Sequence, residues 1–295
     1  MKRKLVSLAL VALLAGCTDR SASYSIDNPT DKPLSLTIDG KTYDVAAHDG
    51  KSLSLSAGEH TMKGDMVGDI RFISYFRGRG GIINPTLSDY VIYRQSFEKE
   101  NTTSPGYKGK LDQIVLDGVT FEGTMKQENG LFIDKDWTYD VDEELPDSVT
   151  EHDNGANNTV HNKVFRAKDF IAFFEKNADA KGYFESNRPK DFVPVARKVT
   201  LLPATLPPID DPALEKLAAP RREIYARYLK ATDASDQESL QKENFKESMA
   251  FSRGSMEIND KARLSQEAYR QINDFEEAMN RAFGSTALVE STHPL

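Results

Sequence analysis

Histidine is the side chain most often used for metal binding and for acid–base chemistry near neutral pH. The 295-residue chain has five, at His48, His60, His152, His161 and His293. None lies four residues from another, so the His-x-x-x-His spacing of a helical metal site is absent. His152 and His161 flank an asparagine-rich loop near acidic residues. This arrangement admits a zinc site, but a solvated loop is the favoured interpretation.

Carboxylates are concentrated in residues 134–153, which hold nine Asp and Glu side chains and a single lysine, Lys135. Hard cations such as Ca²⁺ prefer oxygen ligands of this kind. The segment lacks the glycine and terminal glutamate of an EF-hand loop, and Trp137, Tyr139 and Val141 alternate with its charges. We therefore predict a strand with one apolar and one acidic face, followed by an acidic loop, with calcium binding as the alternative.

The stretch Arg77–Gly81 combines two guanidinium groups with glycine-rich backbone, which suits phosphate or carboxylate. It lacks the lysine and hydroxyl residue of a P-loop, so a connection between strands is the favoured interpretation. Ser88, Ser252 and Ser255 do not lie in a Gly-x-Ser-x-Gly motif. No catalytic residue, cofactor-binding residue or metal ligand is predicted, and no cofactor is expected.

Cys17 is the only cysteine, and the residues before it form an export signal. Three cationic residues precede an apolar run of 11 residues, Leu5–Ala15. As a helix this run spans about 17 Å, against about 30 Å for a hydrocarbon core, so it is too short to span a membrane. Its ending, Leu14-Ala15-Gly16-Cys17, resembles the lipobox of bacterial lipoproteins. The resemblance implies cleavage before Cys17, lipid attachment to its thiol and acylation of the new amino terminus.

The same resemblance implies a location in the cell. Maturation of a lipoprotein supplies three acyl chains, and two or more chains hold a protein firmly on a bilayer. Thr18, rather than an aspartate, follows the cysteine. By the sorting rule of such lipoproteins, we expect a chain anchored in the outer membrane and facing the periplasm of the cell envelope.

The net charge and the cysteine content exclude further classes of partner and of chemistry. The chain has a formal charge of −8, and removal of Lys2, Arg3 and Lys4 with the signal leaves 35 basic and 46 acidic residues, or −11. An acidic body argues against nucleic acid as a partner, because that needs a basic surface. With Cys17 lipidated, no thiol remains for a disulfide or a nucleophile.

The first half of the chain has the pattern of short strands. Leu34, Leu36 and Ile38 alternate with polar residues before the hairpin signal Asp39-Gly40. Residues 34–60 resemble the PEGA-type β modules of bacterial surface proteins, which are accessory modules, so the resemblance implies no catalysis. A second Asp-Gly signal lies at Asp117-Gly118 in a similar sequence. Two independent hairpins are favoured over a duplicated unit.

The second half has helical patterns. We predict a helix over residues 167–177, and a helix capped by Asp211 with Pro212 at its first position. Two more helices follow, the first capped by Ser235 or Asp236 and the second by Asn259 or Asp260. The last has one apolar stripe, for which packing within the chain is favoured over a coiled coil between chains. The stripe comprises Leu264, Ala268, Ile272, Phe275, Met279 and Ala282.

These patterns predict an α+β protein with a sandwich-like antiparallel β-rich region, a mixed segment and a C-terminal helical hairpin or small bundle. The predicted divisions are a signal peptide (1–16), a lipidated tether (17–23), a β-rich domain (24–150), a mixed α/β segment (151–202), a proline-rich connector (203–212), a helical region (213–284) and a tail (285–295). We expect a membrane-anchored binding or assembly module with an envelope protein or glycan as partner. The alternative is an envelope hydrolase whose site is assembled from dispersed Asp, Glu and His.

Overall fold

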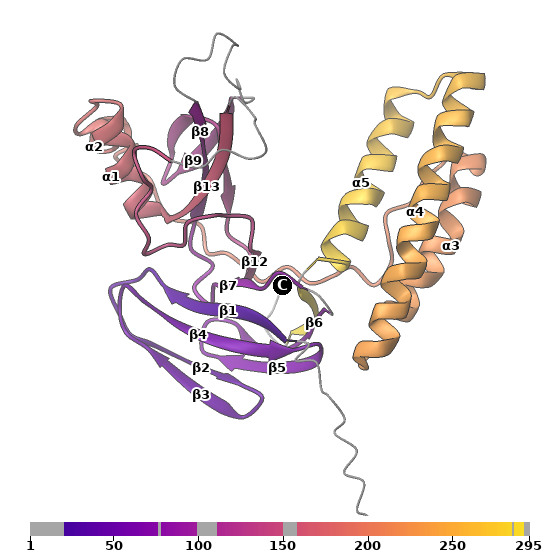
Figure 1. Cartoon of the computed structure of the whole chain (residues 1–295), viewed down its shortest axis with the longest axis horizontal. Coiled ribbons are helices and arrows are strands. Elements are labelled where there is room, and N and C mark those ends of the chain that lie inside the picture. Colours follow the sequence, from indigo (N-terminus) through magenta and orange to yellow (C-terminus); the bar gives the residue numbers. More distant parts are fainter. Residues whose placement is uncertain (1–20, 76–77, 99–110, 150–157, 285, 292–295) are drawn as a thin grey trace, which may run out of the picture.

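The computed structural model describes residues 21–75, 78–98, 111–149, 158–284 and 286–291 (Figure 1). Its strands are β1 (Ser21–Asn28), β2 (Leu34–Ile38), β3 (Lys41–Val45), β4 (Asp49–Ser56), β5 (Gly58–Gly64), β6 (Gly68–Ser74), β7 (Gly81–Ile83), β8 (Tyr90–Glu98), β9 (Asp112–Leu116), β10 (Val119–Gly123), β11 (Met125–Glu128), β12 (Phe132–Asp134), β13 (Asn158–Arg166) and β14 (Thr286–Ser291). Its helices are α1 (Ala167–Asn177), α2 (Tyr183–Asn187), α3 (Pro212–Tyr228), α4 (Ala234–Ala262) and α5 (Gln266–Ala282). The predicted α+β class is confirmed.

Two sheets enclose the first hydrophobic core. One has the strand order β12-β7-β1-β4, in which β1 runs antiparallel to β4 and parallel to β7. The other has the order β14-β6-β5-β2-β3 and is antiparallel. Tyr24 and Ile26 of β1 share a core with Leu36 of β2 and Phe72 of β6. Alternating apolar residues thus turn inward from both sheets, as the strand pattern predicts.

Both Asp-Gly signals form the predicted hairpins. Asp39 and Gly40 join β2 to β3 with φ values of 49° and 76°, and Asp117 and Gly118 join β9 to β10 with 47° and 81°. A two-residue turn of this type needs positive φ at both positions, which Asp tolerates and Gly adopts without strain.

A third sheet, β11-β8-β13, and the β9–β10 hairpin form another layer with α1. The helix α1 begins and ends where predicted, at residues 167 and 177. Its aromatic side chains cover the hairpin: the rings of Phe121 and Phe174 are 5.0 Å apart between centroids. Burial of these rings holds the helix against the strands.

The prediction of a strand around Trp137, Tyr139 and Val141 is wrong. The structure has only an isolated bridge between Tyr139 and Lys163 there. The main-chain carbonyls of Asp140 and Val141 accept hydrogen bonds from the Lys163 ammonium instead of from a neighbouring strand. A buried cation therefore sets the path of this segment, and the apolar alternation does not.

The C-terminal helices form a bundle around a second core. Asp211 caps α3 as predicted, accepting from the amides of Ala213 and Leu214. The caps predicted for the next two helices are wrong: Asp233 caps α4, which continues through residue 262, and Ser265 caps α5. The predicted apolar stripe of α5 packs within the chain.

The bundle attaches to the β region through stacked aromatic rings. The ring of Tyr75, which follows β6, stacks on the ring of Tyr228 in α3 with 4.6 Å between their centroids. The ring of Phe283, which follows α5, stacks on the same Tyr228 ring with 4.0 Å between centroids. These residues belong to one buried cluster or pack against it. The stack thus joins the end of a central strand to two helices at once.

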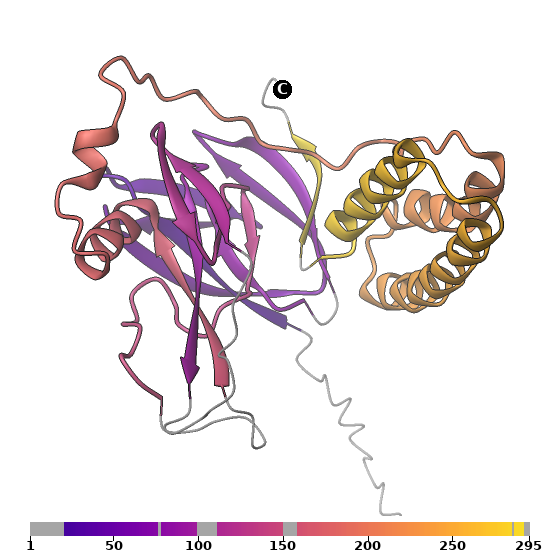
Figure 2. The same cartoon turned by 90° about the horizontal axis from the view of Figure 1, so that it is seen from above.

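Segments that the sequence analysis assigns to different regions pair in the same sheets of the structure. Strand β13, from the predicted mixed segment, pairs along its whole length with β8. Strand β14, from the predicted tail, pairs with β6. Residues 188–211, here called the strap, contain neither helix nor strand and cross over the β region to reach the bundle (Figure 2). Among the described residues, no helix is both long and apolar enough to cross a membrane.

Candidate functional site

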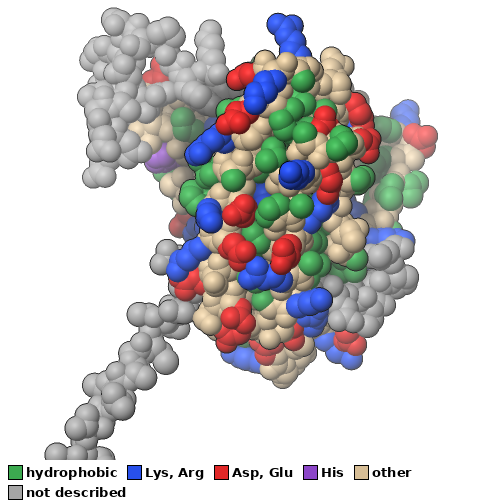
Figure 3. Space-filling model, turned by 90° about the vertical axis from the view of Figure 1, so that its right-hand side faces the viewer, with side chains coloured by type: hydrophobic (Ala, Val, Ile, Leu, Met, Phe, Trp, Pro, Cys, Tyr) green, Lys and Arg blue, Asp and Glu red, His purple; other side chains and the backbone are tan. Residues whose placement is uncertain are grey.

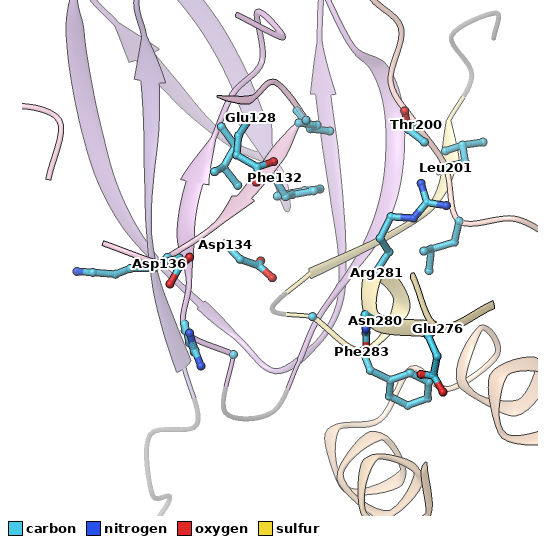
Figure 4. Close-up of a pocket in the computed structure, with 18 of the residues that line it drawn as sticks. Glu128, Phe132, Asp134, Asp136, Thr200, Leu201, Glu276, Asn280, Arg281 and Phe283 are labelled. Carbon is cyan, nitrogen blue, oxygen red and sulfur yellow. The ribbon is translucent and has the colours of Figure 1, made fainter. Parts of the chain in front are cut away.

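A cleft of about 1250 Å³ lies between the β region and the helical bundle. Residues 126–136 around β11 and β12 form one wall, residues 197–202 of the strap form another, and side chains of α3, α4 and α5 form the third. Figure 4 labels Glu128, Phe132, Asp134 and Asp136 on the β wall, Thr200 and Leu201 on the strap, and Glu276, Asn280, Arg281 and Phe283 on the helical wall.

The cleft is cationic within an acidic protein. Seven basic residues line it: Arg79, Lys126, Lys135, Arg197, Lys198, Arg221 and Arg281. Four acidic residues line it: Glu128, Asp134, Asp136 and Glu276. The described residues that line the cleft thus carry +3, whereas the chain as a whole carries −8. Walls of one sign focus the field and attract ligands of the opposite sign.

Several of these cations are neutralised by neighbouring groups. On the β wall, the Lys126 ammonium lies 3.1 Å from the Asp136 carboxylate and 3.4 Å from that of Glu128. On the strap, the Arg197 guanidinium donates to the Asp89 carboxylate at 2.6 Å and to the carbonyl of Leu87 at 2.7 Å. Arg197 therefore ties the strap to the β region.

Arg221 is neutralised in the same way on the helical wall. Its side chain is only 2% exposed and pairs with the carboxylate of Glu276. Its guanidinium also lies 5.3 Å from the centroid of the Phe275 ring. A buried, paired and stacked guanidinium holds α3 against α5.

Lys198 and Arg281 differ from these residues. Both are exposed, and no carboxylate of the described residues lies within ion-pair distance of either cation. Arg281 extends from α5 toward the strap, near Leu201 (Figure 4). Burial raises the pKa of the neighbouring Tyr225 to about 12, and the positive charge of Arg281 opposes that rise. These two cations are available to an anionic ligand.

Apolar side chains border the same cleft. Phe245 of α4 lines it and is 70% exposed, and Met249, one turn further along α4, is 53% exposed. The surface that carries the helices shows hydrophobic side chains interspersed with charges rather than in one continuous patch (Figure 3). The cleft therefore combines polar recognition with small apolar contacts.

A second concentration of charge surrounds the buried side chains of Asp27, Tyr90 and Arg166, and the exposed carboxylate of Asp142 completes it. Arg166, at the end of β13, donates to the two Asp27 carboxylate oxygens at 2.6 and 2.9 Å and to Asp142 at 2.7 Å. The hydroxyl of Tyr90 donates to Asp27 at 2.5 Å. We call these four residues the buried joint. Burial opposes the charge of Arg166, but the hydrogen bonds to Asp27 and Asp142 outweigh it and raise its pKa. Every charge in the joint has a partner, so its role is structural.

Lys163 lies beside the joint. Its side chain is buried, and its ammonium donates to the carbonyls of Asp140, Val141 and Val164. Burial lowers the pKa of Lys163 to about 8, and the nearby carboxylates of Asp140 and Asp142 oppose this shift. The lysine therefore holds the acidic segment in place at some electrostatic cost.

The histidines that the structure describes lie apart from one another, each with a separate partner. Cys17, His152 and His293 lie outside the described residues. His161 shares a 3.0 Å hydrogen bond with the hydroxyl of Tyr139. His60 Nδ1 lies 2.6 Å from Asp39, and His48 Nε2 lies 2.6 Å from Asp31. In the part of the chain that the structure describes, no three His, Cys, Asp or Glu residues form a group able to hold a metal ion.

Other candidate residues have local explanations. Arg77 lies outside the described residues, whereas Arg79 lines the cleft. A Cβ on Gly80 would lie 1.8 Å from the Ser23 carbonyl oxygen, and one on Gly81 would lie 1.9 Å from that of Ile133. These glycines thus permit close strand packing. The hydroxyl of Ser88 bonds that of Thr86, that of Ser255 donates to the carbonyl of Phe251, and Ser252 is exposed on α4.

Sequence reasoning missed the residues that define the cleft, above all Lys198, Phe245 and Arg281. One signal was present: α4 carries two apolar stripes. Leu240 and Phe251 are buried in the bundle, whereas Phe245, Met249 and Met256 lie on an exposed face. A second stripe on one helix indicates a surface beyond the core.

Comparison of the chain with family models, curated proteins and solved structures gave no match. The chemistry of the cleft is therefore inferred from its own residues.

Proposed function

We propose that the chain is a lipoprotein, anchored through Cys17 in the outer membrane and facing the periplasm, that binds an anionic partner in the cleft. The observation that carries the binding role is the pair of exposed cations, Lys198 and Arg281, which face the cleft without a carboxylate partner among the described residues. A lipid anchor would hold such a site close to the bilayer, because only residues 18–20 separate Cys17 from β1.

A cationic cleft in a protein of negative net charge makes binding selective for anionic ligands at that cleft. The acidic surroundings repel anions elsewhere on the surface, so anionic ligands collect where the sign reverses. Both cations lie near solvent, and their attraction is therefore screened by salt over about 8 Å at physiological ionic strength. Binding should accordingly weaken as salt is added.

The test is a crosslinking pull-down from intact cells with the lipidated protein. Lys198→Glu combined with Arg281→Glu reverses two exposed cations of the cleft that have no ion-pair partner among the described residues. The matched control, Lys190→Glu with Lys261→Glu, makes the same change in net charge at exposed residues outside the cleft. We expect the wild type and the control to capture the same partner and the cleft variant to lose it.

An exported form without Cys17 and its lipid tests the anchor separately. We expect weaker capture, because the partner must then be met in solution rather than at the bilayer. Equal capture by the cleft variant and its control, or no partner from the wild type, would contradict the proposed binding role. Equal capture with and without the lipid would contradict only the contribution of the anchor.

A further inference from the structure

An apolar groove adjoins the cleft along the strap. The groove has a volume of about 780 Å³ and is lined by residues 198–204 of the strap, by Leu229 after α3 and by Arg71 of β6. Four residues of the strap line both the cleft and the groove: Lys198, Thr200, Leu201 and Leu202. Because the cleft and the groove meet along these residues, one ligand can occupy both.

The groove differs from the cleft in its chemistry. Six of its nine lining residues are apolar: Val199, Leu201, Leu202, Pro203, Ala204 and Leu229. Of its two cations, Arg71 pairs with the carboxylate of Glu59 at 2.6 Å, whereas Lys198 has no ion-pair partner among the described residues. Apolar surface is more stable when it is removed from water, so the groove favours a hydrocarbon ligand.

Two cations lie where the cleft and the groove meet. Lys198 lines both, and Arg281 extends from α5 toward Leu201, which also lines both (Figure 4). An anionic group bound by Lys198 and Arg281 therefore has the apolar groove beside it. A simple anion contacts only the cations, whereas an amphiphile with an anionic head and a hydrocarbon tail contacts the cations and the groove together.

The cleft also lies close to the first strand of the chain. A Cβ on Gly80 would lie 1.8 Å from the carbonyl oxygen of Ser23 in β1, and the neighbouring Arg79 lines the cleft. Lys135, whose amide donates to the Gly80 carbonyl at 2.9 Å, lines it too. Ser23 is six positions after Cys17, which an extended chain spans in at most about 22 Å. The proposed anchor thus holds this end of the cleft near a bilayer, whose anionic phospholipids attract cations.

Building on the proposed function, we infer that the anionic partner of the cleft is a phospholipid with a negatively charged headgroup. Lys198 and Arg281 bind its phosphate, since ammonium and guanidinium groups form strong hydrogen bonds with phosphate oxygens. The groove takes part of an acyl chain. A glycan or an inorganic anion offers no hydrocarbon for the groove, so the groove favours a lipid over both.

The probe is dihexanoyl phosphatidylglycerol, used below its critical micelle concentration so that it is monomeric. It is titrated by calorimetry into the exported form without Cys17, which carries no acyl chain of its own. Glycerophosphoglycerol has the same head without the tails, and dihexanoyl phosphatidylcholine has the same tails on a head without net charge. We expect phosphatidylglycerol to bind at least about tenfold more tightly than either, because each lacks one of the two contacts.

Charge reversal tests the contact with the headgroup. Lys198→Glu with Arg281→Glu removes both cations from the meeting point, and Lys190→Glu with Lys261→Glu is the control for net charge outside the cleft. We expect the cleft variant to bind phosphatidylglycerol at least about tenfold more weakly than the control. Circular dichroism verifies that both variants are folded.

A charge placed in the groove tests the contact with the acyl chain. Ala204→Glu introduces a carboxylate at an exposed residue that lines the groove. Thr205→Glu makes the same change in net charge at the next residue, which is exposed and lines neither the groove nor the cleft. We expect Ala204→Glu to bind phosphatidylglycerol at least about tenfold more weakly than Thr205→Glu, because a buried carboxylate opposes an acyl chain. Circular dichroism again verifies folding.

The outcomes separate this inference from the proposed function. If glycerophosphoglycerol binds as tightly as phosphatidylglycerol, the cleft binds anions without the groove and the lipid is wrong. If both phospholipids bind equally, the cations do not select the head and the inference is wrong again. If no probe binds, the phospholipid class is wrong, whereas a protein that the pull-down captures with the wild type but not with the cleft variant still supports the proposed function.

The pull-down also detects a phospholipid when the captured material is extracted and analysed by mass spectrometry. We expect the wild type to carry more phosphatidylglycerol than the cleft variant. If charge reversal has no effect in the titration or in the pull-down, the proposed function itself fails.

Discussion

Arg166 and Arg281 have the same side chain but differ in burial and in their ion-pair partners. Arg166 is 8% exposed and bonds two carboxylates within the buried joint, whereas Arg281 is exposed and has no carboxylate partner among the described residues. Around Arg166 two carboxylates face one guanidinium, whereas around Arg281 the described residues that line the cleft keep a surplus of +3. The difference lies in what surrounds each guanidinium, because only a cation without a partner of its own has donors left for a ligand.

The comparison assigns different roles to the two regions. The joint connects β1, β8 and β13, and its residues come together only when both sheets have formed. The cleft connects the strap, β12 and the bundle, but Lys198 and Arg281 stabilise none of these elements through an ion pair among the described residues. Changes in the joint should therefore act on stability, and changes at the cleft cations should act on binding.

Loss of Asp27 should have the largest effect on stability. Asp27→Ala leaves the buried guanidinium of Arg166 with only the exposed carboxylates of Asp142 and Asp169. It also removes the acceptor of the Tyr90 hydroxyl. Breaking a buried ion pair by removing one partner costs about 3–5 kcal/mol. Denaturant unfolding followed by circular dichroism measures the change in the free energy of unfolding.

Its control is the exposed pair between Arg227 and Glu243, at 3.0 Å. Glu243→Ala should cost less than about 1 kcal/mol, because exposed pairs are screened by solvent. A variant without Asp27 that is as stable as this control would show that the joint does not hold the sheets together.

Lys163 should produce a pH dependence of intermediate size. Its pKa falls from 10.5 in the unfolded chain to about 8 in the fold. Between these values the unfolded chain binds the proton and the folded chain does not, so stability rises with pH at up to about 1.4 kcal/mol per pH unit. We expect this increase from pH 8 to pH 10 in wild-type protein and its loss in Lys163→Met, by denaturant unfolding at each pH. Parallel curves for the two proteins would contradict the shift.

The smallest effect on stability is expected at the cleft. Lys198→Glu with Arg281→Glu should change the free energy of unfolding by no more than about 0.5 kcal/mol, as exposed substitutions usually do. The thermal midpoint, compared with that of Lys190→Glu with Lys261→Glu, measures this. A large loss of stability in the cleft variant alone would contradict this expectation, because it would show that Arg281 stabilises the fold.

Local signals were sufficient for many elements. Asp39-Gly40 sets a turn by its own backbone conformation, and Asp211 caps α3 through amides two and three residues away. The caps of α4 and α5 were predicted wrongly because capping residues are common near both starts. Asp233 precedes Ser235 and Asp236 and uses its carboxylate to accept from both of their amides.

The joint and the cleft could not be predicted, because their residues are far apart in the sequence. Asp27 and Arg166 are separated by 139 residues, and each carboxylate in an acidic chain is an equally good candidate for the pairing. Lys198 and Arg281 line the same cleft only because of the path that the strap takes. The acidic segment was predicted from its own alternation, yet Lys163, a residue outside it, determines its conformation.

Site-specific photo-crosslinking in intact cells tests most directly whether the cleft binds a partner. A photoreactive phenylalanine replaces Phe245, which lines the cleft, or Val195, which is 84% exposed on the strap outside it. We predict a discrete adduct from residue 245 of the lipidated protein, none from residue 195, and loss of the adduct when Lys198 and Arg281 are replaced by glutamate. The same adduct from both residues, or an adduct that survives the charge reversal, would contradict a binding role for the cleft.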